Sequence, residues 1–562
     1  MRYALLLLFF TYNLFAFSLP FYFKGNETLS ERELYSAIGF DKPYFYQFWR
    51  DEPHCEASNT QLYKTILQDY YRSKGFYHAS IRISINEERI TFKIQEKDFI
   101  EVADISMISD IDFKDYLTLH VRDRFEAGRF VADKQAIMDY AQDQGYCNAD
   151  LSSKAWIDKE ENQAYLLYEL HKDKTCHFGA INVTDSSGFD PWLIQSFLRF
   201  KEGEKYSSEK IRQSYDLLYA QGGLAKATIE PKEHNGTKVP IDLYVSRRDE
   251  PIRFRTGIGV NSDEGIILQA GVIHRNFFDN LKTLSLDARY SEIKQVLKST
   301  FTMPLIDHNL FGTTIGYKNE HFDGYKEKSK YMTPYLQQYD QPHSFKEAIL
   351  IDNAITYDSS DSDLFSESNL LISSLIFNWK YDIRDKLLEP TQGYYLFSDI
   401  QGSYKSQISD STYIKALLGA ARLFSYYQHV FGLKASLGSI RLYDGALPAS
   451  YRFYAGGMNS NRAYSYRMLG PTNDRGDPTG FHSLAEATAE YRFPILGDLR
   501  GVVFNDITLI GQEYLPDQNK PYVALGTGLR YSTPIGPFAI DIAMDVKDPS
   551  QYAVHFHIGE LF

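Results

Sequence analysis

The stretch Tyr451-Arg-Phe-Tyr-Ala-Gly-Gly-Met-Asn-Ser-Asn-Arg-Ala-Tyr-Ser-Tyr-Arg-Met-Leu-Gly-Pro471 stands near the C-terminal end of the chain, between two segments with strand-like alternation. It contains a glycine pair (Gly456 and Gly457), an isolated central arginine (Arg462) and Tyr464, and it closes on a Gly-Pro pair. Paired glycines and a Gly-Pro end are typical of a loop. A loop of this composition between alternating strands is unusual, so its structural role has to be inferred from the strands on either side.

Apolar and polar residues alternate in many segments after about residue 251. Clear examples are Leu284–Tyr290, Ala487–Phe493 and Tyr552–Ile558. A period of two indicates strands with one polar and one apolar face. The chain is also rich in aromatic residues, with 43 Tyr and 38 Phe. Its mean hydropathy is −0.37. Both a soluble β-rich protein and a transmembrane β-barrel are compatible with these values.

The N-terminus favours the membrane alternative. Met1-Arg2 is a short positive start, residues 3–17 are almost wholly apolar, and Ala16-Phe17-Ser18 offers a small-x-small cleavage site. This pattern predicts a secretory signal peptide over residues 1–18, although a buried first helix or strand is the alternative. The net charge of −13 argues against a nucleic-acid partner, which would require basic patches.

A repeated motif occurs three times before residue 250. Gly75–Ala79, Gly145–Ala149 and Gly223–Ala227 share the form Gly-apolar-x-x-Ala. Each motif follows a helical pattern, so we expect each glycine to end a helix in the left-handed conformation. Two alternating stretches come next, and a short strand with a first helix opens each unit. The predicted order is β-α-α-β-β in each of three units.

This order resembles a POTRA domain, the periplasmic module of the BamA/TamA superfamily of outer membrane assembly factors. The quoted loop resembles the loop that folds back into the barrel lumen of that superfamily. There the core pattern is Val-Arg-Gly-Tyr, and the same positions here are Asn461, Arg462, Ala463 and Tyr464. Further stretches resemble barrel segments of the superfamily in the right order: His274–Phe278, Tyr381–Asp385 and Gly526–Pro537.

The resemblance implies α+β POTRA repeats in three copies, followed by a transmembrane antiparallel β-barrel of 16 strands. The expected divisions are a signal peptide (1–18), POTRA domains (19–98, 99–172 and 173–250) and an outer membrane β-barrel (251–562). The exposed sheet edges of POTRA domains can receive an extended strand from another chain.

The resemblance also predicts an ion-pair lock inside the barrel. Arg462 would reach into the lumen and bond Glu490, Asp506 or both, because a buried charge needs a partner. Asp506 belongs to Phe504-Asn505-Asp506, which resembles the Phe-x-Asp motif of the superfamily. Tyr464, Gly456 and Gly457 complete the predicted lock. In the alternative, Arg462 is solvated at a loop tip.

A second predicted site is the seam between the first barrel strand (252–260) and the last (552–562). Gly257 and Gly259 in the first strand and Gly559 in the last weaken them locally, so the pair could open sideways toward the bilayer. These glycines could instead only permit curvature. Phe562, the final residue, resembles the signal by which outer membrane barrels are recognised for assembly.

The chain has three cysteines. Cys147 and Cys176 flank a predicted antiparallel hairpin, so a disulfide between them is geometrically possible. Three separate buried thiols are the alternative. His555 and His557 share a strand face, but a third ligand is missing, and no metal or cofactor is expected.

As a function, the resemblance implies a TamA-like factor of the outer membrane of a Gram-negative bacterium, with its POTRA domains in the periplasm. It would help to insert or translocate unfolded outer membrane clients, autotransporters among them, without enzymatic activity. Implied partners are a TamB-like protein anchored in the inner membrane and outer membrane lipids. The alternatives are a BamA-like core factor, which usually has five POTRAs, a two-partner-secretion transporter, which usually has two, and a passive pore.

Overall fold

The computed structural model describes most of the chain, namely residues 18–43, 51–185, 188–233, 236–306, 309–340, 342–496, 498–518, 520–533 and 538–558. Apart from Ser18, the predicted signal peptide lies outside these residues, and so do Gly559 and Phe562. Among the helices of the described residues, none is long and apolar enough to cross a membrane.

The first repeat folds as a four-stranded sheet in the order β2-β1-β4-β3 with two helices. Its elements are β1 Ser18–Lys24, α1 Glu31–Ala37, β2 His54–Glu56, a 3-10 turn Ala57–Asn59, α2 Thr60–Ser73, β3 Ser80–Ile85 and β4 Ile90–Gln95. Aromatic rings fill its core, where Phe21 contacts Tyr35 at 5.0 Å between ring centroids and Phe92 at 6.0 Å. Gly75 follows α2 with a φ of 88°, the left-handed conformation expected of it.

The second repeat has a three-stranded sheet in the order β5-β7-β6. Its elements are β5 Glu101–Ser109, a 3-10 turn Lys114–Tyr116, α3 Ala127–Asp143, β6 Asp150–Asp158 and β7 Gln163–His171. The expected first helix is therefore reduced to a single 3-10 turn. The buried Asp133 of α3 accepts hydrogen bonds from the backbone N–H of Thr118 (2.6 Å) and Leu119 (3.2 Å). These bonds hold the segment extended past the turn, so no longer helix forms.

The third repeat has a three-stranded sheet in the order β8-β10-β9. Its elements are β8 His177–Asp185, α4 Pro191–Gln195, α5 Ser208–Ala220, β9 Leu224–Pro231 and β10 Lys238–Arg247. The expectation of a left-handed Gly223 is wrong, because the left-handed residues of the described chain do not include it. Gly223 instead permits close packing, since an added Cβ would lie 2.7 Å from the backbone oxygen of Arg275.

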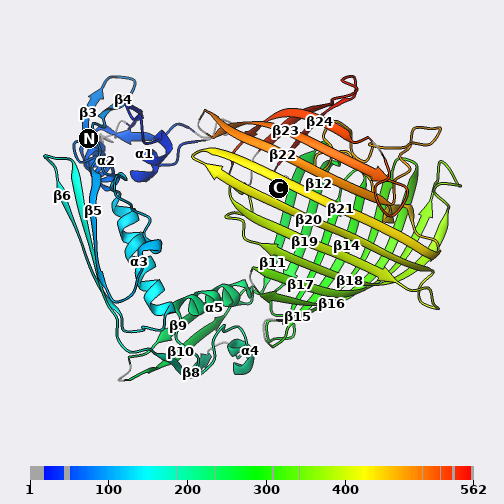
Figure 1. Ribbon diagram of the computed structural model, residues 1–562, viewed down its shortest axis with the longest axis horizontal. Helices are drawn as coiled ribbons and strands as arrows, with labels where there is room; N and C mark the ends of the chain where they lie inside the picture. The colour runs from blue at the N-terminus through cyan, green and yellow to red at the C-terminus, as the bar shows by residue number, and fades with distance from the viewer. Residues whose placement is uncertain are drawn as a thin grey trace, which may run out of the picture. The chain divides into compact units, whose positions relative to one another are not determined.

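The rest of the chain forms one 16-stranded antiparallel sheet, in which each strand pairs with its neighbours in sequence. The predicted number of barrel strands is thus confirmed, and Figure 1 shows them wound into a barrel. The strands are β11 Ile252–Asn261, β12 Gly265–His274, β13 Thr283–Tyr290, β14 Lys294–Pro304, β15 Asn309–Phe322, β16 Tyr325–Asp340, β17 His343–Tyr357, β18 Ser368–Asp382, β19 Gly393–Ser403, β20 Ser411–Tyr426, β21 His429–Gly445, β22 Ser483–Leu496, β23 Leu499–Gly511, β24 Tyr522–Tyr531, β25 Phe538–Asp545 and β26 Tyr552–Ile558.

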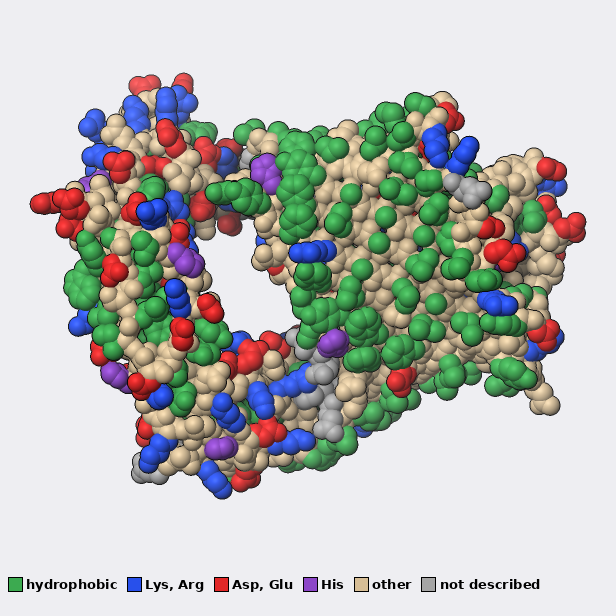
Figure 2. Space-filling model, viewed as in Figure 1, with side chains coloured by type: hydrophobic (Ala, Val, Ile, Leu, Met, Phe, Trp, Pro, Cys, Tyr) green, Lys and Arg blue, Asp and Glu red, His purple; other side chains and the backbone are tan. Residues whose placement is uncertain are grey.

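Strict alternation separates the two faces of this sheet. In β25, exposed and buried residues alternate without exception. Ile540 and Ile542 face outward, whereas Asp541 and Asp545 are buried on the inner side. Figure 2 shows the result on one face of the barrel, where hydrophobic side chains cover the strands and charged side chains are sparse. An apolar outer band with a polar interior is the pattern of a membrane-spanning barrel.

Candidate functional site

The quoted stretch belongs to a long connection between β21 and β22, residues 446–482. Apolar side chains fix this lumen loop against the inner wall of the barrel. Phe453, Leu469 and Phe481 are buried together with Ile510 of β23 and Ile372 of β18. Isolated β-bridges, Phe453 with Phe481 and Ala455 with Leu469, fold the loop back on itself. The loop is therefore a packed part of the barrel interior.

The glycine pair gives the loop tip its conformation. Gly456 and Gly457 have φ values of 99° and 104°, which side-chain-bearing residues rarely adopt. An added Cβ would lie 2.5 Å from the backbone oxygen of Ser465 at Gly456, and 2.7 Å from Oδ2 of Asp263 at Gly457. The backbone N–H of Met458 donates to the same Asp263 carboxylate, at 3.1 Å to Oδ2. Asp263 lies in the turn between β11 and β12, so the pair brings the loop to the first hairpin of the barrel.

Arg462 lies at the centre of the loop, and its side chain is 1% exposed. Its guanidinium donates two bonds to Asp506, from Nε to Oδ2 and from Nη2 to Oδ1, each 2.9 Å long. Nη1 donates to Glu490 Oε2 at 3.0 Å and to Asp541 Oδ2 at 3.2 Å. The structure thus places Arg462 against both carboxylates named from the sequence and against a third. A bidentate bond of this kind fixes direction as well as distance.

Neighbouring arginines neutralise the remaining charge of this cluster. Arg492 Nε donates to Glu490 Oε1 at 2.8 Å, and Arg530 donates to both oxygens of Asp541 at 2.6 and 2.9 Å. All six side chains are almost fully buried. Three cations therefore face three anions, which offsets the large cost of removing each charge from water. Loss of one member would leave a buried charge uncompensated.

The residues around Arg462 complete the contact with the wall. The Phe504 ring lies under the guanidinium, with its centroid 3.3 Å from Cζ. The Tyr464 hydroxyl donates to Asp545 Oδ2 at 2.7 Å. Ala463 is fully buried against Val502, Phe504 and Ala524, and it is absent from the left-handed residues. Alanine therefore fits the backbone at this position of the loop and adds buried contact.

Sequence reasoning missed Asp541, Arg530 and Arg492 as members of this cluster. Asp541 and Arg530 are charged residues between small residues of the same strand face, as in Ala539-x-Asp541-x-Ala543 and Gly526-x-Gly528-x-Arg530, and Arg492 shares its face with Glu490. That signal was visible in the sequence. Their proximity was not, because it depends on pairings such as Gly528 with Asp541 and Thr488 with Asp506.

The two ends of the barrel sheet meet at a seam that carries no β-ladder within the described residues. β11 pairs only with β12 and β26 only with β25 in the strand order. One backbone hydrogen bond joins the two sides, from the Ser262 N–H just past β11 to the Phe556 carbonyl, at 3.1 Å. The Ser262 hydroxyl also lies 3.1 Å from Nδ1 of His555.

The predicted seam residues are only partly described. Gly257 and Gly259 lie in β11, where an added Cβ would meet nothing closer than 3.8 Å, so close packing does not require glycine there. Gly559 and Phe562 lie outside the described residues.

The lumen loop contacts both sides of this seam. On one side, Met458 bonds Asp263 beside β11, as described above. On the other side, His555 Nε2 in β26 lies 3.1 Å from the carbonyl oxygen of Arg462. Gln551, just before β26, donates from Nε2 to the Ala463 carbonyl at 3.1 Å. One loop tip therefore bridges the first and last strands at the same end of the barrel.

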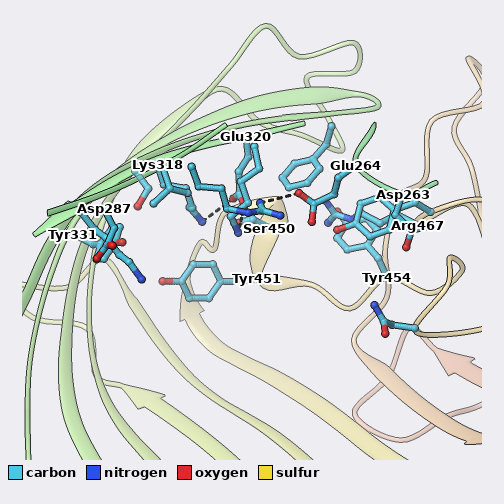
Figure 3. Close-up of a pocket in the computed structure, with 18 of the residues that line it drawn as sticks. Asp263, Glu264, Asp287, Lys318, Glu320, Tyr331, Ser450, Tyr451, Tyr454 and Arg467 are labelled. Atoms are coloured by element: carbon cyan, nitrogen blue, oxygen red, sulfur yellow. Dashed lines mark ion pairs between the residues drawn. The ribbon is translucent and has the colours of Figure 1, made fainter. Parts of the chain in front are cut away.

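A polar cavity of about 1360 Å³ lies between the lumen loop and the strand wall. Figure 3 shows charged groups of the strands and tyrosines of the loop around it. Lys318 Nζ pairs with Glu320 at 2.7 Å, and the Ser450 hydroxyl donates to Glu327 at 2.8 Å. Tyr451 in the loop donates to Asp352 at 3.3 Å. Such a lining keeps the lumen polar, as in other barrels with a polar interior.

The three cysteines belong to the repeats that precede the barrel in the sequence. The structure joins Cys147 and Cys176 in a disulfide, with 5.8 Å between their Cα atoms. Cys55 is a free and buried thiol in the first repeat. Among the described residues, no group of three or more His, Cys, Asp and Glu side chains could hold a metal ion.

Comparisons with known proteins agree with this architecture. A model of the Omp85 superfamily domain matches residues 273–562, and a POTRA model described as a surface antigen variable number repeat matches residues 21–97. The outer membrane protein assembly factor BamA of Nitratidesulfovibrio vulgaris is 22% identical over 587 residues, which covers 96% of this chain and 72% of that protein. BamA of Neisseria meningitidis serogroup B is 20% identical over 531 residues, which covers 84% of this chain and 65% of that protein.

A solved structure, BamA from Haemophilus ducreyi lacking POTRA domains 1-3, superposes with a TM-score of 0.57 at 16% identity. The superposition covers 82% of this chain and 99% of the Haemophilus ducreyi chain. At this level of identity the likeness shows a shared fold. The chain spans about two thirds to three quarters of the two curated BamA proteins.

Proposed function

The chain belongs to the Omp85 superfamily, and from this premise we propose that it is an outer membrane protein assembly factor that inserts unfolded β-barrel clients at the seam between β11 and β26. Its barrel lies in the outer membrane, and its POTRA domains lie in the periplasm. The family consists of non-enzymatic assembly factors, in agreement with the expectation that the chain is not an enzyme.

One observation carries this proposal: within the residues that the structure describes, which end at Ile558, the seam lacks a ladder, although every other neighbouring pair of barrel strands has one. An unpaired strand edge presents free N–H and C=O groups, which are costly in a bilayer and can template a new strand. A client strand that pairs with such an edge would satisfy those groups. The lumen loop holds the two sides together at one end, so opening would begin at the other end.

The POTRA sheets support the reception of clients before insertion. In the second repeat, β5 and β6 are the edge strands, and in the third repeat β8 and β9 are. An extended segment can add to such an edge through backbone hydrogen bonds, with little demand on its sequence. Unfolded outer membrane proteins consist mainly of such segments, so the proposed clients match the proposed site.

Two versions of this role differ in their partners. The relatives named above are BamA proteins, which favours a core role in assembly of many outer membrane proteins. The TamA-like version would serve a narrower set, such as autotransporters, and would require a TamB-like partner. Depletion of the protein separates them: a general loss of outer membrane barrels supports the core role, and a loss confined to autotransporters supports the TamA-like role.

Crosslinking the seam tests the proposal directly. Extension of the Ser262–Phe556 contact in antiparallel register places Val260 opposite Ile558. We would introduce V260C and I558C in a Cys55→Ala background, oxidise the purified protein in proteoliposomes, and follow folding of a reporter barrel by its protease resistance. We expect client folding to fall to the level of empty liposomes.

The matched control is an I258C/L268C pair, which links β11 to β12 across an existing ladder. Its oxidation should leave client folding unchanged, since it does not cross the seam. Continued client folding with a fully crosslinked seam would show that the seam is only structural. In that case a passive pore or a holding role confined to the POTRA domains would fit better.

A further inference from the structure

Three lysines lie in a row on the outer face of β16. Ser329 and Tyr331 of this strand line the lumen cavity. Because side chains alternate between the faces of a strand, Lys326, Lys328 and Lys330 point outward. The POTRA repeats join the barrel where β11 begins, and β16 begins five crossings later, at the opposite end. The row therefore lies toward the outer leaflet of the membrane.

Among the described residues, only one of the three lysines in this row pairs with a carboxylate. Lys326 forms an ion pair with Asp358. Lys328 Nζ lies 4.1 Å from the centroid of the Tyr357 ring. Lys330 is exposed, and among the described residues no carboxylate pairs with it or with Lys328. Two cations at the lipid-facing surface thus lack an anion.

The outward positions beside the lysines are polar but uncharged. Asn319 donates to Gln295 Oε1 at 3.2 Å and accepts from the Tyr357 hydroxyl at 3.0 Å. Asn353 donates to Asn369 at 2.7 Å. A band of amides and lysines at this level matches a layer of headgroups better than hydrocarbon, in which unpaired charges are costly.

An apolar groove of about 560 Å³ continues from Lys330 along the outer face. Its walls come from the adjacent strands β13 to β18, and they include the half-buried Leu371 of β18. Its other apolar members are Leu286, Leu297, Ile315, Tyr317, Met332 and Ile351. All six of these side chains are among the exposed large hydrophobic residues of the protein. The groove has the dimensions of a ligand pocket and suits hydrocarbon chains.

We propose that this part of the barrel, from β13 to β18, binds a phosphorylated and acylated lipid of the outer leaflet. Lys328 and Lys330 would contact phosphate groups, for which lysine is a suitable point charge. The groove below would hold an acyl chain. Charge complementarity selects this occupant, because two unneutralised cations directly adjoin a hydrocarbon-lined surface. Such a lipid would orient the barrel and anchor this part of its wall during client insertion.

Native mass spectrometry of the full-length protein in detergent tests this proposal. The probes are a diphosphorylated, hexa-acylated glucosamine disaccharide lipid, its dephosphorylated form, and inorganic phosphate. We expect tight binding of the diphosphorylated lipid by the unmodified protein. The K328Q/K330Q variant should bind it at least about tenfold more weakly, given the contribution of each lysine near a phosphate. I315W, which fills the groove, should also weaken binding.

The matched control is K405Q, a surface lysine in the connection between β19 and β20 that pairs with Asp444. It should bind the lipid like the unmodified protein. Equal binding by K328Q/K330Q, or equal binding of the dephosphorylated lipid, would overturn the proposal. Competition by millimolar inorganic phosphate with no effect of I315W would mean that only free anions bind. Dimers that form without lipid and are lost in I315W would assign the groove to a second copy of the chain.

Discussion

Arg462 is the residue on which the position of the lumen loop depends most. Its guanidinium bonds Asp506, Glu490 and Asp541, which lie on three different strands. We expect Arg462→Ala to destabilise the barrel by about 3–5 kcal/mol, because it leaves buried carboxylates without compensation. The measurement is the temperature at which the heat-modifiable barrel band shifts in gel electrophoresis, and it should fall.

Arg475 provides the control, since it lies exposed in the same loop. Arg475→Ala should leave the transition temperature unchanged. Arg462→Lys should fall between the two, because an ammonium keeps the charge but cannot form the bidentate bond. If Arg462→Ala and Arg475→Ala unfold at the same temperature, the arginine does not lock the loop.

Gly457 tests the contact between the loop tip and the first hairpin. Gly457 and Gly476 both have positive φ values, 104° and 88°. A Cβ at Gly457 would meet Asp263, whereas a Cβ at Gly476 would meet nothing within 4 Å. Both alanine variants should cost about 1–2 kcal/mol in backbone strain. Only Gly457→Ala should also speed hydrogen exchange at Met458, whose N–H bonds Asp263. Equal exchange in the two variants would contradict the bridging role.

The sequence identified half of this site, and its limits are physical. Arg462, Glu490 and Asp506 stand in recognisable motifs, so their roles could be proposed from one chain. Asp541 and Arg530 could not be assigned, because their position relative to Arg462 depends on strand register and on the shear of the barrel. Neither quantity is encoded in a local pattern.

At the scale of elements, the disulfide and a helix cap connect the second repeat to the third. Cys147 follows α3 of the second repeat, and Cys176 immediately precedes β8 of the third. Asp143, the last residue of α3, accepts from the Ser208 hydroxyl at 3.1 Å and from the Glu209 N–H at 2.8 Å. It therefore caps α5 of the next repeat. We infer that these contacts restrict bending between the two domains.

We expect C147S/C176S to lose about 3–4 kcal/mol of stability in this region, from the loop-closure entropy of a 29-residue separation. Hydrogen exchange at the first turn of α5 should then become faster. Peptide mapping under non-reducing conditions should show the Cys147–Cys176 pair, with Cys55 alone alkylated after unfolding. In the folded protein Cys55 should react slowly, because burial raises its pKa to about 11. Three alkylated thiols without reduction would exclude the bridge.

The connection between the first two repeats should depend on pH through Glu126. Burial alone would raise the pKa of the Glu126 carboxyl, but hydrogen bonding and attraction by Arg124, at 2.8 Å, and attraction by Lys74, at 3.4 Å, lower it overall. A lowered folded-state pKa stabilises the fold above the ordinary glutamate pKa of about 4.3, and this contribution is lost as pH falls through the folded value.

Protection from hydrogen exchange near Lys74, expressed relative to the intrinsic exchange rate at each pH, should therefore fall as pH falls below about 4. The Glu126→Gln variant should show low protection that no longer depends on this titration. Identical pH profiles for the two proteins would show that the ion pair contributes nothing.

The elements themselves were partly predictable. The helix ending at Gly75 followed from a glycine after an amphipathic segment, a local rule that tertiary contacts did not disturb. Gly223 has the same sequence context, but this glycine permits close packing against Arg275 and is not left-handed. The prediction of a first helix in the second repeat was also wrong, because Asp133 holds the chain extended there. Long-range contacts overrode local preference in both cases.

At the scale of the molecule, alternation indicated strands, but a resemblance was needed to count them. Period-two patterns cannot by themselves distinguish a membrane barrel from a soluble β-domain, since both have one apolar face. Closure of the barrel is harder still to predict, because the sequences of β11 and β26 do not indicate whether these two strands pair. The seam between β11 and β26, on which the proposed activity rests, could thus be suggested from the sequence but not established from it.

The packed lumen makes a last prediction about the whole barrel. A passive pore would conduct ions steadily, whereas here the loop of residues 446–482 occupies the interior and Arg462 fixes it to β22, β23 and β25. In planar bilayers we expect small, intermittent conductance from the unmodified protein. Arg462→Ala should produce larger and longer openings, because the loop tip loses its bonds to the wall, and Arg475→Ala should not. Large, steady conductance that is identical in all three proteins would mean that the loop does not plug the lumen, and the passive pore would then become the better description of this barrel.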